Sequence, residues 1–396
     1  MMMASSIAGA RVSVGAKAAP KAGRRTVACG AVATSVKKGS ELKKGVVTGQ
    51  DLIDVLDHAK AHGYGIPAVN CTMSPVTNAC LEAAMKANSP MMIQFSNGGG
   101  IYNVGKGVKN EADQKAAIVG TVAGALHTRE VAAMYGVPIM LHTDHCAKKL
   151  LPWFDGLLEA NEEYFAKHGE PLFSSHMLDL SEESMEENLE ICEKYLKRMS
   201  AINCFLEMEI GITGGEEDGV DNSDAKPEDL YSKPEEIYQV YERLSKISPN
   251  FSIAAAFGNV HGVYAPGNVK LTPKILQAGQ AYVKDKTGCE DDKPVRFVFH
   301  GGSGSTREEI REAISYGVMK MNIDTDTQWS FWDGVREYVA KNHDYLQSQI
   351  GNPEGAGKPN KGKYDPRAWM RQAELATVDR LMTAYEDLNA VDALAK

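Results

Sequence analysis

From Val46 onward, short apolar runs alternate with amphipathic stretches, and each apolar run ends in a polar residue or a glycine. Apolar runs of this length are typical of buried strands, while the stretches between them have helical periodicity, for example over 113–135, 184–199 and 272–284. The strand-like runs end near these residues: Asn70, Ser96, Asp144, Asp179, Gly211, Gly258, Gly301 and Asp324. Eight strands separated by helices predict an α/β fold, a closed (β/α)8 TIM barrel rather than an open doubly wound sheet.

The longest connection lies between the fifth and sixth predicted strands. It contains Thr213-Gly-Gly-Glu-Glu-Asp-Gly219 and an acidic stretch with Ser and Pro before a helix near Tyr238. A connection this long in a compact domain is more often a mobile active-site loop than a linker. After the last strand the pattern predicts a helix through 329–345 and a final helix over 369–388, which together form a C-terminal helical extension.

Charge and apolar content exclude some classes of partner. The formal net charge of −9 argues against a general nucleic-acid binder, so we expect no nucleic-acid partner. No run is long and apolar enough to cross a bilayer, so we expect no membrane partner either. Seven cysteines without zinc-finger spacing favour a reducing compartment over a disulfide framework.

The first forty residues differ from the rest of the chain. They hold seven Lys or Arg and no acid before Glu41, without the continuous apolar core of a secretory signal. This composition predicts an organellar transit peptide over 1–36, followed by a single barrel domain over 37–396; a disordered basic tail is the alternative. Because Val27-Ala-Cys-Gly-Ala31 looks like a plastid processing region, we expect the plastid stroma, with the mitochondrion or the cytoplasm as alternatives.

Polar groups follow every predicted strand. The reactive face of such a barrel lies at the carboxyl ends of its strands, so these side chains are candidates for one site. They are Asn70, Ser96, Asp144 with His145, Asp179, Glu209, His261, His300, and Asn322 with Asp324. Three imidazoles from three strands, His145, His261 and His300, predict a catalytic zinc site with an open position. Asp144 stands beside that metal and could move protons to or from what the metal holds.

Two turns after the seventh and eighth strands are suited to an anion. His300-Gly-Gly-Ser-Gly-Ser305 lets bare backbone approach a ligand and opens a helix, whose N–H groups attract negative charge. Asn322-Ile-Asp-Thr-Asp-Thr327 offers similar donors beside it. This is the usual phosphate position in barrels of this class.

Together these motifs resemble the class II, zinc-dependent fructose-bisphosphate aldolases, in their longer, bacterial-type subgroup. The likeness runs from about Gly45 to the end of the chain, and Ala265 stands where the family has a lysine. It rests on HTDHCAKKLLPW (142–153), TGGEEDGVDN (213–222), FGNVHGVYAPG (257–267), FHGGSGS (299–305) and MNIDTDTQW (321–329).

The resemblance implies reversible aldol cleavage of fructose 1,6-bisphosphate to dihydroxyacetone phosphate and glyceraldehyde 3-phosphate through a zinc-stabilised enediolate. The setting would be glycolysis, gluconeogenesis or the Calvin cycle. Tagatose bisphosphate and sedoheptulose bisphosphate are alternative substrates, because the sequence does not fix the stereochemistry at C4. The family is dimeric, so a homodimer is expected.

The resemblance also implies roles for individual residues. His145, His261 and His300 would bind Zn2+, while Asp179 and Glu209 would hold a second or alternative divalent position. A monovalent cation such as K+ or Na+ is a further expectation near the phosphate pocket.

The catalytic roles fall on three residues. Asp144 would move the proton of the aldehyde or C4 hydroxyl oxygen, Glu217 the proton at the reacting carbon of dihydroxyacetone phosphate, and Asn322 would steady the enediolate. Arg367 matches an arginine that reaches a phosphate from the partner subunit. The complete substrate-binding set is Asn70, Ser96, Gly262, Gly301, Gly302, Ser303, Asn322, Ile323, Asp324, Thr325 and Arg367.

Three alternative interpretations of the site are a Schiff-base mechanism, a zinc hydrolase and a zinc-dependent scaffold. Lys320 points inward, two residues before Asn322, and could form a Schiff base that replaces the metal, although pairing with a carboxylate such as Glu207 is favoured. A zinc hydrolase would use the same metal to activate water. A zinc-dependent scaffold would need no catalytic groups.

The other histidines are assigned to supporting or surface positions. We expect His142 to lie behind the metal ligands rather than among them. Four other histidines are expected on exposed helix faces: His58, His62, His168 and His343.

Overall fold

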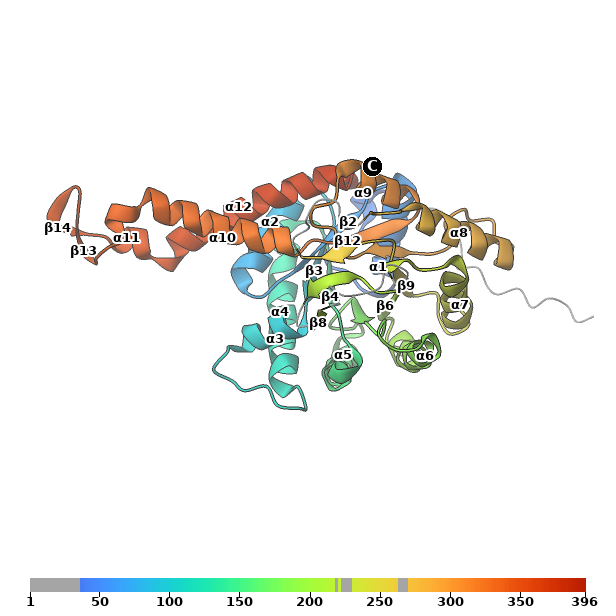
Figure 1. Cartoon of the computed structure of the whole chain (residues 1–396). Coiled ribbons are helices and arrows are strands. Elements are labelled where there is room, and N and C mark those ends of the chain that lie inside the picture. Colours follow the sequence, from blue (N-terminus) through green and yellow to red (C-terminus); the bar gives the residue numbers. More distant parts are fainter. Residues whose placement is uncertain (1–35, 218–219, 222–229, 263–269) are drawn as a thin grey trace, which may run out of the picture.

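The computed structural model describes residues 36–217, 220–221, 230–262 and 270–396. Eight parallel strands close into a barrel surrounded by helices, in the spatial order β4-β3-β2-β12-β11-β9-β6-β5, with β5 pairing back to β4 (Figure 1). Their bounds are β2 Ile66–Asn70, β3 Met91–Phe95, β4 Pro138–Thr143, β5 Ser175–Leu178, β6 Phe205–Ile210, β9 Phe251–Ala255, β11 Phe297–Phe299 and β12 Val318–Asn322. The predicted barrel is confirmed.

Helices cover the outer faces of the barrel strands. They are α1 Gly49–His62, α2 Ser74–Ala87, α3 Asn97–Val104, α4 Lys115–Ala132, α5 Leu151–His168, α6 Met185–Ala201, α7 Pro234–Leu244, α8 Lys274–Thr287 and α9 Arg307–Ser315. The predicted helices over 113–135, 184–199 and 272–284 therefore lie within a few residues of α4, α6 and α8. None of the helices in the described ranges is long and apolar enough to cross a membrane.

Short strands complete the sheets outside the barrel. β1 (Gly45–Val46) pairs in parallel with β4. In the long connection, β7 (Gly214–Glu217) pairs with β8 (Val220–Asp221) and with β10 (Val260–His261), so the root of this connection is tied to the segment that carries His261. Residues 218–219 and 222–229 of this connection lie outside the described part of the chain.

A helical arm extends from the barrel at the C-terminal side. It consists of α10 (Thr325–Lys341), the strands β13 (Ile350–Asn352) and β14 (Gly355–Pro359), α11 (Lys361–Tyr364) and α12 (Pro366–Asp387). Figure 1 shows β13, β14 and α11 at the tip of the arm, away from the barrel. α12 returns from the tip to the barrel, where Tyr385 donates a hydrogen bond to the carbonyl of Pro90 just before β3.

One histidine assignment is wrong. His62, His168 and His343 are exposed, as predicted, but His58 is fully buried and its Nδ1 lies 2.9 Å from the hydroxyl of Tyr64. The C-terminal residue Lys396 lies beside His58 and over the ring of Tyr64, and its carbonyl accepts a hydrogen bond from the amide of Gly39. Helical periodicity alone does not reveal that a distant segment covers this face.

Candidate functional site

Three histidines meet at the carboxyl end of the barrel. His145 follows β4, His261 ends β10 and His300 follows β11, and each places one ring nitrogen within 4.8 Å of the others. The ring centroid of His145 lies 4.6 Å from that of His300 and 5.1 Å from that of His261. His145 has a φ of 36°, a left-handed conformation that is unfavourable for a residue with a Cβ and is typical of functional sites.

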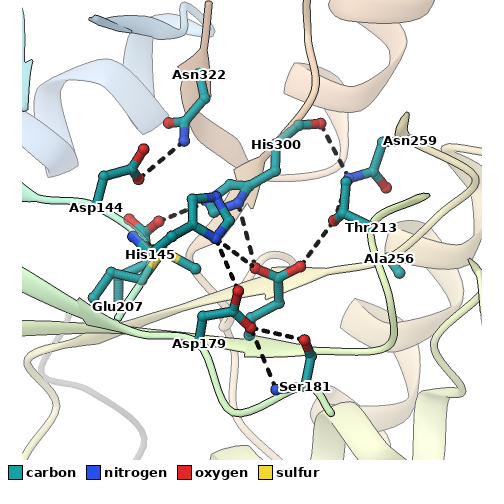
Figure 2. A network of polar contacts seen from close by, with 12 residues as sticks. Asp144, His145, Asp179, Ser181, Glu207, Thr213, Ala256, Asn259, His300 and Asn322 are labelled. Atoms are coloured by element: carbon teal, nitrogen blue, oxygen red, sulfur yellow. Dashed lines mark hydrogen bonds and ion pairs between the residues drawn. The ribbon is translucent and has the colours of Figure 1, made fainter. Parts of the chain in front are cut away.

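Asp179, just after β5, orients His145. Its Oδ2 lies 2.9 Å from Nδ1 of His145, and its Oδ1 accepts hydrogen bonds from the hydroxyl and the amide of Ser181 (Figure 2). Burial opposes ionisation of Asp179, but the hydrogen bond and charge of His145, together with Ser181, hold its pKa below the ordinary value. The carboxylate is therefore ionised at neutral pH.

Glu209, on β6, places a carboxylate beside His145 and His300. Its Oε1 accepts a hydrogen bond of 2.8 Å from the hydroxyl of Thr213, whereas its Oε2 lies 3.4 Å from Nδ1 of His300. Within the described ranges, Oε2 is buried and accepts no hydrogen bond. A buried carboxylate oxygen that faces imidazole nitrogens without a donor suits a cation between them.

These donors fit zinc. Zinc binds imidazole nitrogen and carboxylate oxygen, and three histidines with an open position are typical of catalytic zinc. A second set of donors, from His145, Asp179 and Glu209, also has its ligand atoms within 4.8 Å of one another. The two sets share His145, so a metal could occupy either of two overlapping positions.

A polar layer lies one step deeper in the barrel. Lys320 on β12 contacts both carboxylate oxygens of Glu207 on β6, at 2.8 and 2.9 Å, as the sequence predicted. Burial opposes ionisation of Glu207, but the charge of Lys320 holds its pKa well below the ordinary value. His142 lies in the same layer, fully buried, and burial together with Lys320 lowers its pKa, so His142 is neutral.

His300 lies between the two carboxylates. Its Nε2 lies 2.8 Å from Oε1 of Glu207, while its Nδ1 faces Glu209. Burial lowers the pKa of the imidazole, but the charge of Glu209 and the hydrogen bond with Glu207 outweigh it and raise the pKa to about 9.

Three side-chain amides hold the carboxylate of Asp144. Its Oδ2 accepts hydrogen bonds from Asn70 at 2.9 Å and Gln94 at 2.8 Å, and its Oδ1 accepts one from Asn322 at 3.2 Å. Asp144 is fully buried, so this network fixes the carboxylate at the mouth of the barrel. Gln94 was missed at the sequence level, although it is the one polar residue within the apolar run 91–95.

The turn after β11 has the geometry of an anion site. Gly301 has a φ of 62°, and a Cβ added there would lie 2.3 Å from the carbonyl oxygen of Val260. A Cβ on Gly302 would lie 2.6 Å from Cγ of Met321, so both positions require glycine. Ser303 is nearly buried, and its hydroxyl accepts a hydrogen bond from the amide of Asp326 in the first turn of α10. The two predicted phosphate turns are therefore in contact.

The remaining candidates of this pocket lie close by. Asp324 directly precedes α10, which begins at Thr325, and its Oδ2 accepts a hydrogen bond from the side-chain amide of Gln328. Ile323 is buried, and its amide donates to the carbonyl of Ala68 on β2. Gly262, with a φ of 90°, directly follows His261. Ser96 caps α3 by accepting a hydrogen bond from the amide of Gly99.

Two predicted residues are not brought to the cluster by the described structure. Arg367 is the second residue of α12, at the arm; its side chain is 90% exposed and forms its hydrogen bonds with Asp365. Glu217 ends β7, whose backbone pairs with Val220, but its side chain lies outside the described part of the chain.

Comparisons with known proteins agree with this geometry. The family described as fructose-bisphosphate aldolase class-II matches residues 50–393. A fructose-bisphosphate aldolase of Campylobacter jejuni is 58% identical over 351 residues, covering 89% of this chain and 98% of that protein. The fructose-bisphosphate aldolase class 2 of Escherichia coli K12 is 56% identical over 353 residues, with the same coverage of 89% and 98%.

A solved structure is also similar. The crystal structure of a fructose-bisphosphate aldolase from Campylobacter jejuni has a TM-score of 0.82 and 56% identity, covering 90% of this chain and 99% of that one. The family match spans most of the chain, the relatives are aligned over nearly their full length, and the barrel carries the expected cluster of histidines and carboxylates. The chain therefore belongs to the class II fructose-bisphosphate aldolase family.

Proposed function

We propose that this protein catalyses the reversible aldol cleavage of fructose 1,6-bisphosphate to dihydroxyacetone phosphate and glyceraldehyde 3-phosphate. The observation that carries the proposal is the histidine cluster beside an amide-held Asp144, in a chain of this family. The relatives named fructose-bisphosphate aldolase support the substrate. The bacterial origin of these relatives also favours the longer, bacterial-type subgroup.

Zinc is the proposed metal, held by His145, His261 and His300, with Asp179 and Glu209 providing a second divalent position. When bound there, zinc would polarise the C2 carbonyl of the ketose and so accept the electron pair left as the C3–C4 bond breaks. A monovalent cation beside the phosphate turns belongs to the same proposal; its test is whether KM responds to K+ or Na+ at constant ionic strength.

Asp144 is the proposed base for the C4 hydroxyl in the cleavage direction. Its donors are neutral amides, so they orient the carboxylate without the full positive charge that a lysine or arginine would bring. In condensation the same carboxyl group returns the proton to the aldehyde oxygen. Asn322 is well placed to steady the substrate, because its amide bridges from β12 to Asp144.

Separate groups of the protein are proposed to bind different parts of the bisphosphate. The Gly301–Ser303 turn and the start of α10 would bind one phosphate through backbone N–H groups. Asn70 and Ser96 would contact the rest of the sugar from β2 and β3. Two fixed phosphates align the reacting bond, which lowers the entropic part of the barrier.

A homodimer is proposed to complete the site. Arg367 lies on an arm that projects from its own barrel, and the arm helix α10 exposes Trp329 and Trp332, which are 60% and 55% accessible. Large exposed aromatic side chains favour a protein partner. In a dimer, the partner subunit's Arg367 would be the phosphate ligand.

A cleavage assay on purified, zinc-loaded protein tests the function. We expect cleavage of fructose 1,6-bisphosphate, a weaker or absent reaction with tagatose bisphosphate, and loss of activity in excess chelator that zinc restores. Phosphate release without carbon–carbon cleavage would instead identify a hydrolase, and no turnover of any phosphosugar would favour a scaffold.

Borohydride trapping tests the metal-free alternative. Lys320 is 3% exposed and bonded to both oxygens of Glu207, which leaves it unable to attack a ketose carbonyl. We therefore expect no covalent adduct at Lys320 when borohydride is added with substrate. Activity in chelator together with such an adduct would overturn the zinc mechanism.

A further inference from the structure

The Glu207–Lys320 ion pair lies inside the barrel directly beneath the histidine cluster. Both residues are almost fully buried, and the ammonium group contacts both carboxylate oxygens. The same Oε1 atom lies 2.8 Å from Nε2 of His300 (Figure 2). Barrel interiors are usually filled with Val, Ile and Leu, so two charges at this level call for a specific explanation.

The pair determines which nitrogen of His300 carries hydrogen. An ionised carboxylate can only accept hydrogen bonds, so Nε2 of His300 must be the donor to Glu207. A metal-ligating imidazole is neutral, because the metal replaces the proton on the nitrogen that it binds, so the other nitrogen, Nδ1, then supplies the lone pair. Nδ1 is also the atom that lies 3.4 Å from Oε2 of Glu209, in the cluster with His145 and His261.

We infer that Glu207 and Lys320 are positioning residues that fix His300 as the Nε2–H tautomer and turn its Nδ1 toward the metal. The inference deepens the proposed function and rests on it for the identity of the metal. Lys320 holds both oxygens of Glu207, so the carboxylate plane cannot rotate away from the imidazole. Residues that orient a ligating histidine typically change metal affinity by about 10–100-fold when replaced.

A purely structural role makes a different prediction. Replacing a buried ion pair by apolar residues of similar size is often neutral or stabilising, whereas removing one partner is destabilising. The double variant Glu207→Leu/Lys320→Met should therefore lose less Tm than Lys320→Met alone, although Nε2–H of His300 loses its acceptor. If the pair only fills the barrel, this variant should also bind zinc normally.

The decisive measurement is zinc affinity, obtained by competition between the folded protein and a chromophoric chelator. We expect Glu207→Gln and the double variant to bind zinc about 10–100-fold more weakly than the unsubstituted protein. The visible spectrum of the Co2+-loaded variants should also change, because the ligand geometry at His300 is relaxed. Lys320→Arg keeps the cation and should retain most of the affinity.

The matched control is Arg129→Met. The largely buried guanidinium of Arg129 forms an ion pair with Glu170. This pair joins α4 to the loop before β5, far from the histidine cluster. Its loss should lower Tm and leave zinc affinity unchanged. Folded Glu207 variants that bind zinc within about threefold of the unsubstituted protein would overturn the inference.

A measurement on the unsubstituted, zinc-loaded protein needs no variant to fold. Long-range 15N NMR of histidine-labelled protein should show His300 protonated at Nε2, with the signal assigned by its absence in His300→Gln. Protonation at Nδ1 would overturn the inference. A protein that shows the Nε2–H signal and the affinity loss, but cleaves no ketose bisphosphate, would retain the inference and refute the proposed function.

Discussion

The side-chain amide of Asn322 donates a hydrogen bond of 3.2 Å to Oδ1 of Asp144, across the mouth of the barrel. Asn322 ends β12 and Asp144 follows β4, so the bond links strands that are not neighbours in the sheet. The proposed base and the residue proposed to steady the substrate thus form one unit. Variants here should preserve shape, because a truncation at one residue would displace the other.

Proton transfer at the C4 hydroxyl and proton transfer at the ketose C–H should depend on different residues. Asp144→Asn should lose bond cleavage by about 10²–10⁴-fold and keep exchange of the ketose C–H proton with solvent, because only the C4 hydroxyl needs this base. Glu217→Gln should lose the exchange instead and still bind zinc and dihydroxyacetone phosphate. Deuterium exchange followed by NMR measures both; wild-type exchange in Glu217→Gln would move the base elsewhere.

Arg367 should act on the site of the other subunit. Arg367→Ala should mainly raise KM for the bisphosphate, since it removes a charge-assisted contact with phosphate. Arg336→Ala is a suitable control, because Arg336 is also exposed on the arm and pairs with Asp333 in its own helix. An unchanged KM for Arg367→Ala would show that this arginine does not bind substrate.

Mixing two inactive or impaired variants tests whether the contact crosses subunits. A mixed dimer of Arg367→Ala and Asp144→Asn should contain one site with an intact Asp144 and a partner's Arg367. Co-expression of the two chains with different tags should recover catalytic efficiency in the doubly purified species. If a verified mixed dimer does not recover catalytic efficiency, Arg367 either acts within its own subunit or does not bind substrate.

The free energy of unfolding should decrease on acidification because of His176, which is buried on β5. Burial, aided by the nearby His142, lowers its pKa to about 3. Below about pH 6.5 the unfolded chain takes up a proton that the folded protein does not accept until about pH 3. Its contribution to the free energy of unfolding is therefore present above about pH 6.5 and decreases on acidification by up to about 1.4 kcal/mol per pH unit.

Urea unfolding of the metal-free protein at pH 7.5 and pH 5.5 measures this effect. His176→Gln should be less stable at the higher pH, because Thr143 and Asn161 lose their ring partner, but its stability should change less between the two values. His343→Gln removes an exposed histidine and should keep the pH dependence of the parent. Parallel curves for the parent and His176→Gln would contradict the prediction.

The basic leader should direct the chain to a plastid, which would be consistent with a role in the Calvin cycle. We propose cleavage between Cys29 and Ser35, at or just after the plastid-like processing sequence Val27–Ala31 and within the acid-free stretch that precedes Glu41. A reporter fused to residues 1–45 should accumulate in plastids and be shortened on import. Accumulation in mitochondria would support the alternative address, and a diffuse cytosolic reporter would exclude a transit peptide.

Local pattern predicted the barrel because strand and helix periodicities differ strongly and alternate regularly. It also predicted the set of polar strand ends, since the parallel strands of a barrel bring their carboxyl ends to one face. His145, His261 and His300 are far apart in the chain and meet for this reason. The Lys320–Glu207 pair was predictable because both residues interrupt apolar strands with inward parity.

Contacts between distant segments were harder to predict. Gln94 has the same inward position as those residues, but its partner Asp144 becomes apparent only when β3 and β4 are paired in register. His58 was assigned to the surface because its burial depends on the C-terminal segment, more than 300 residues away in the chain. The orientation of each imidazole depends on hydrogen bonds with other strands, which periodicity does not encode.

The number of residues in the helix that carries Arg367 sets both the position and the direction of this side chain. α12 has 22 residues and is about 33 Å long, and Arg371 near its start pairs with Glu82 on α2. One residue inserted between Arg367 and this anchor would turn Arg367 about the helix axis by about 100°, whereas four residues would nearly restore its direction but move it about 6 Å along the axis. An arginine delivered from such a helix has its direction set by residue count, so the arm tolerates changes of sequence far better than changes of length.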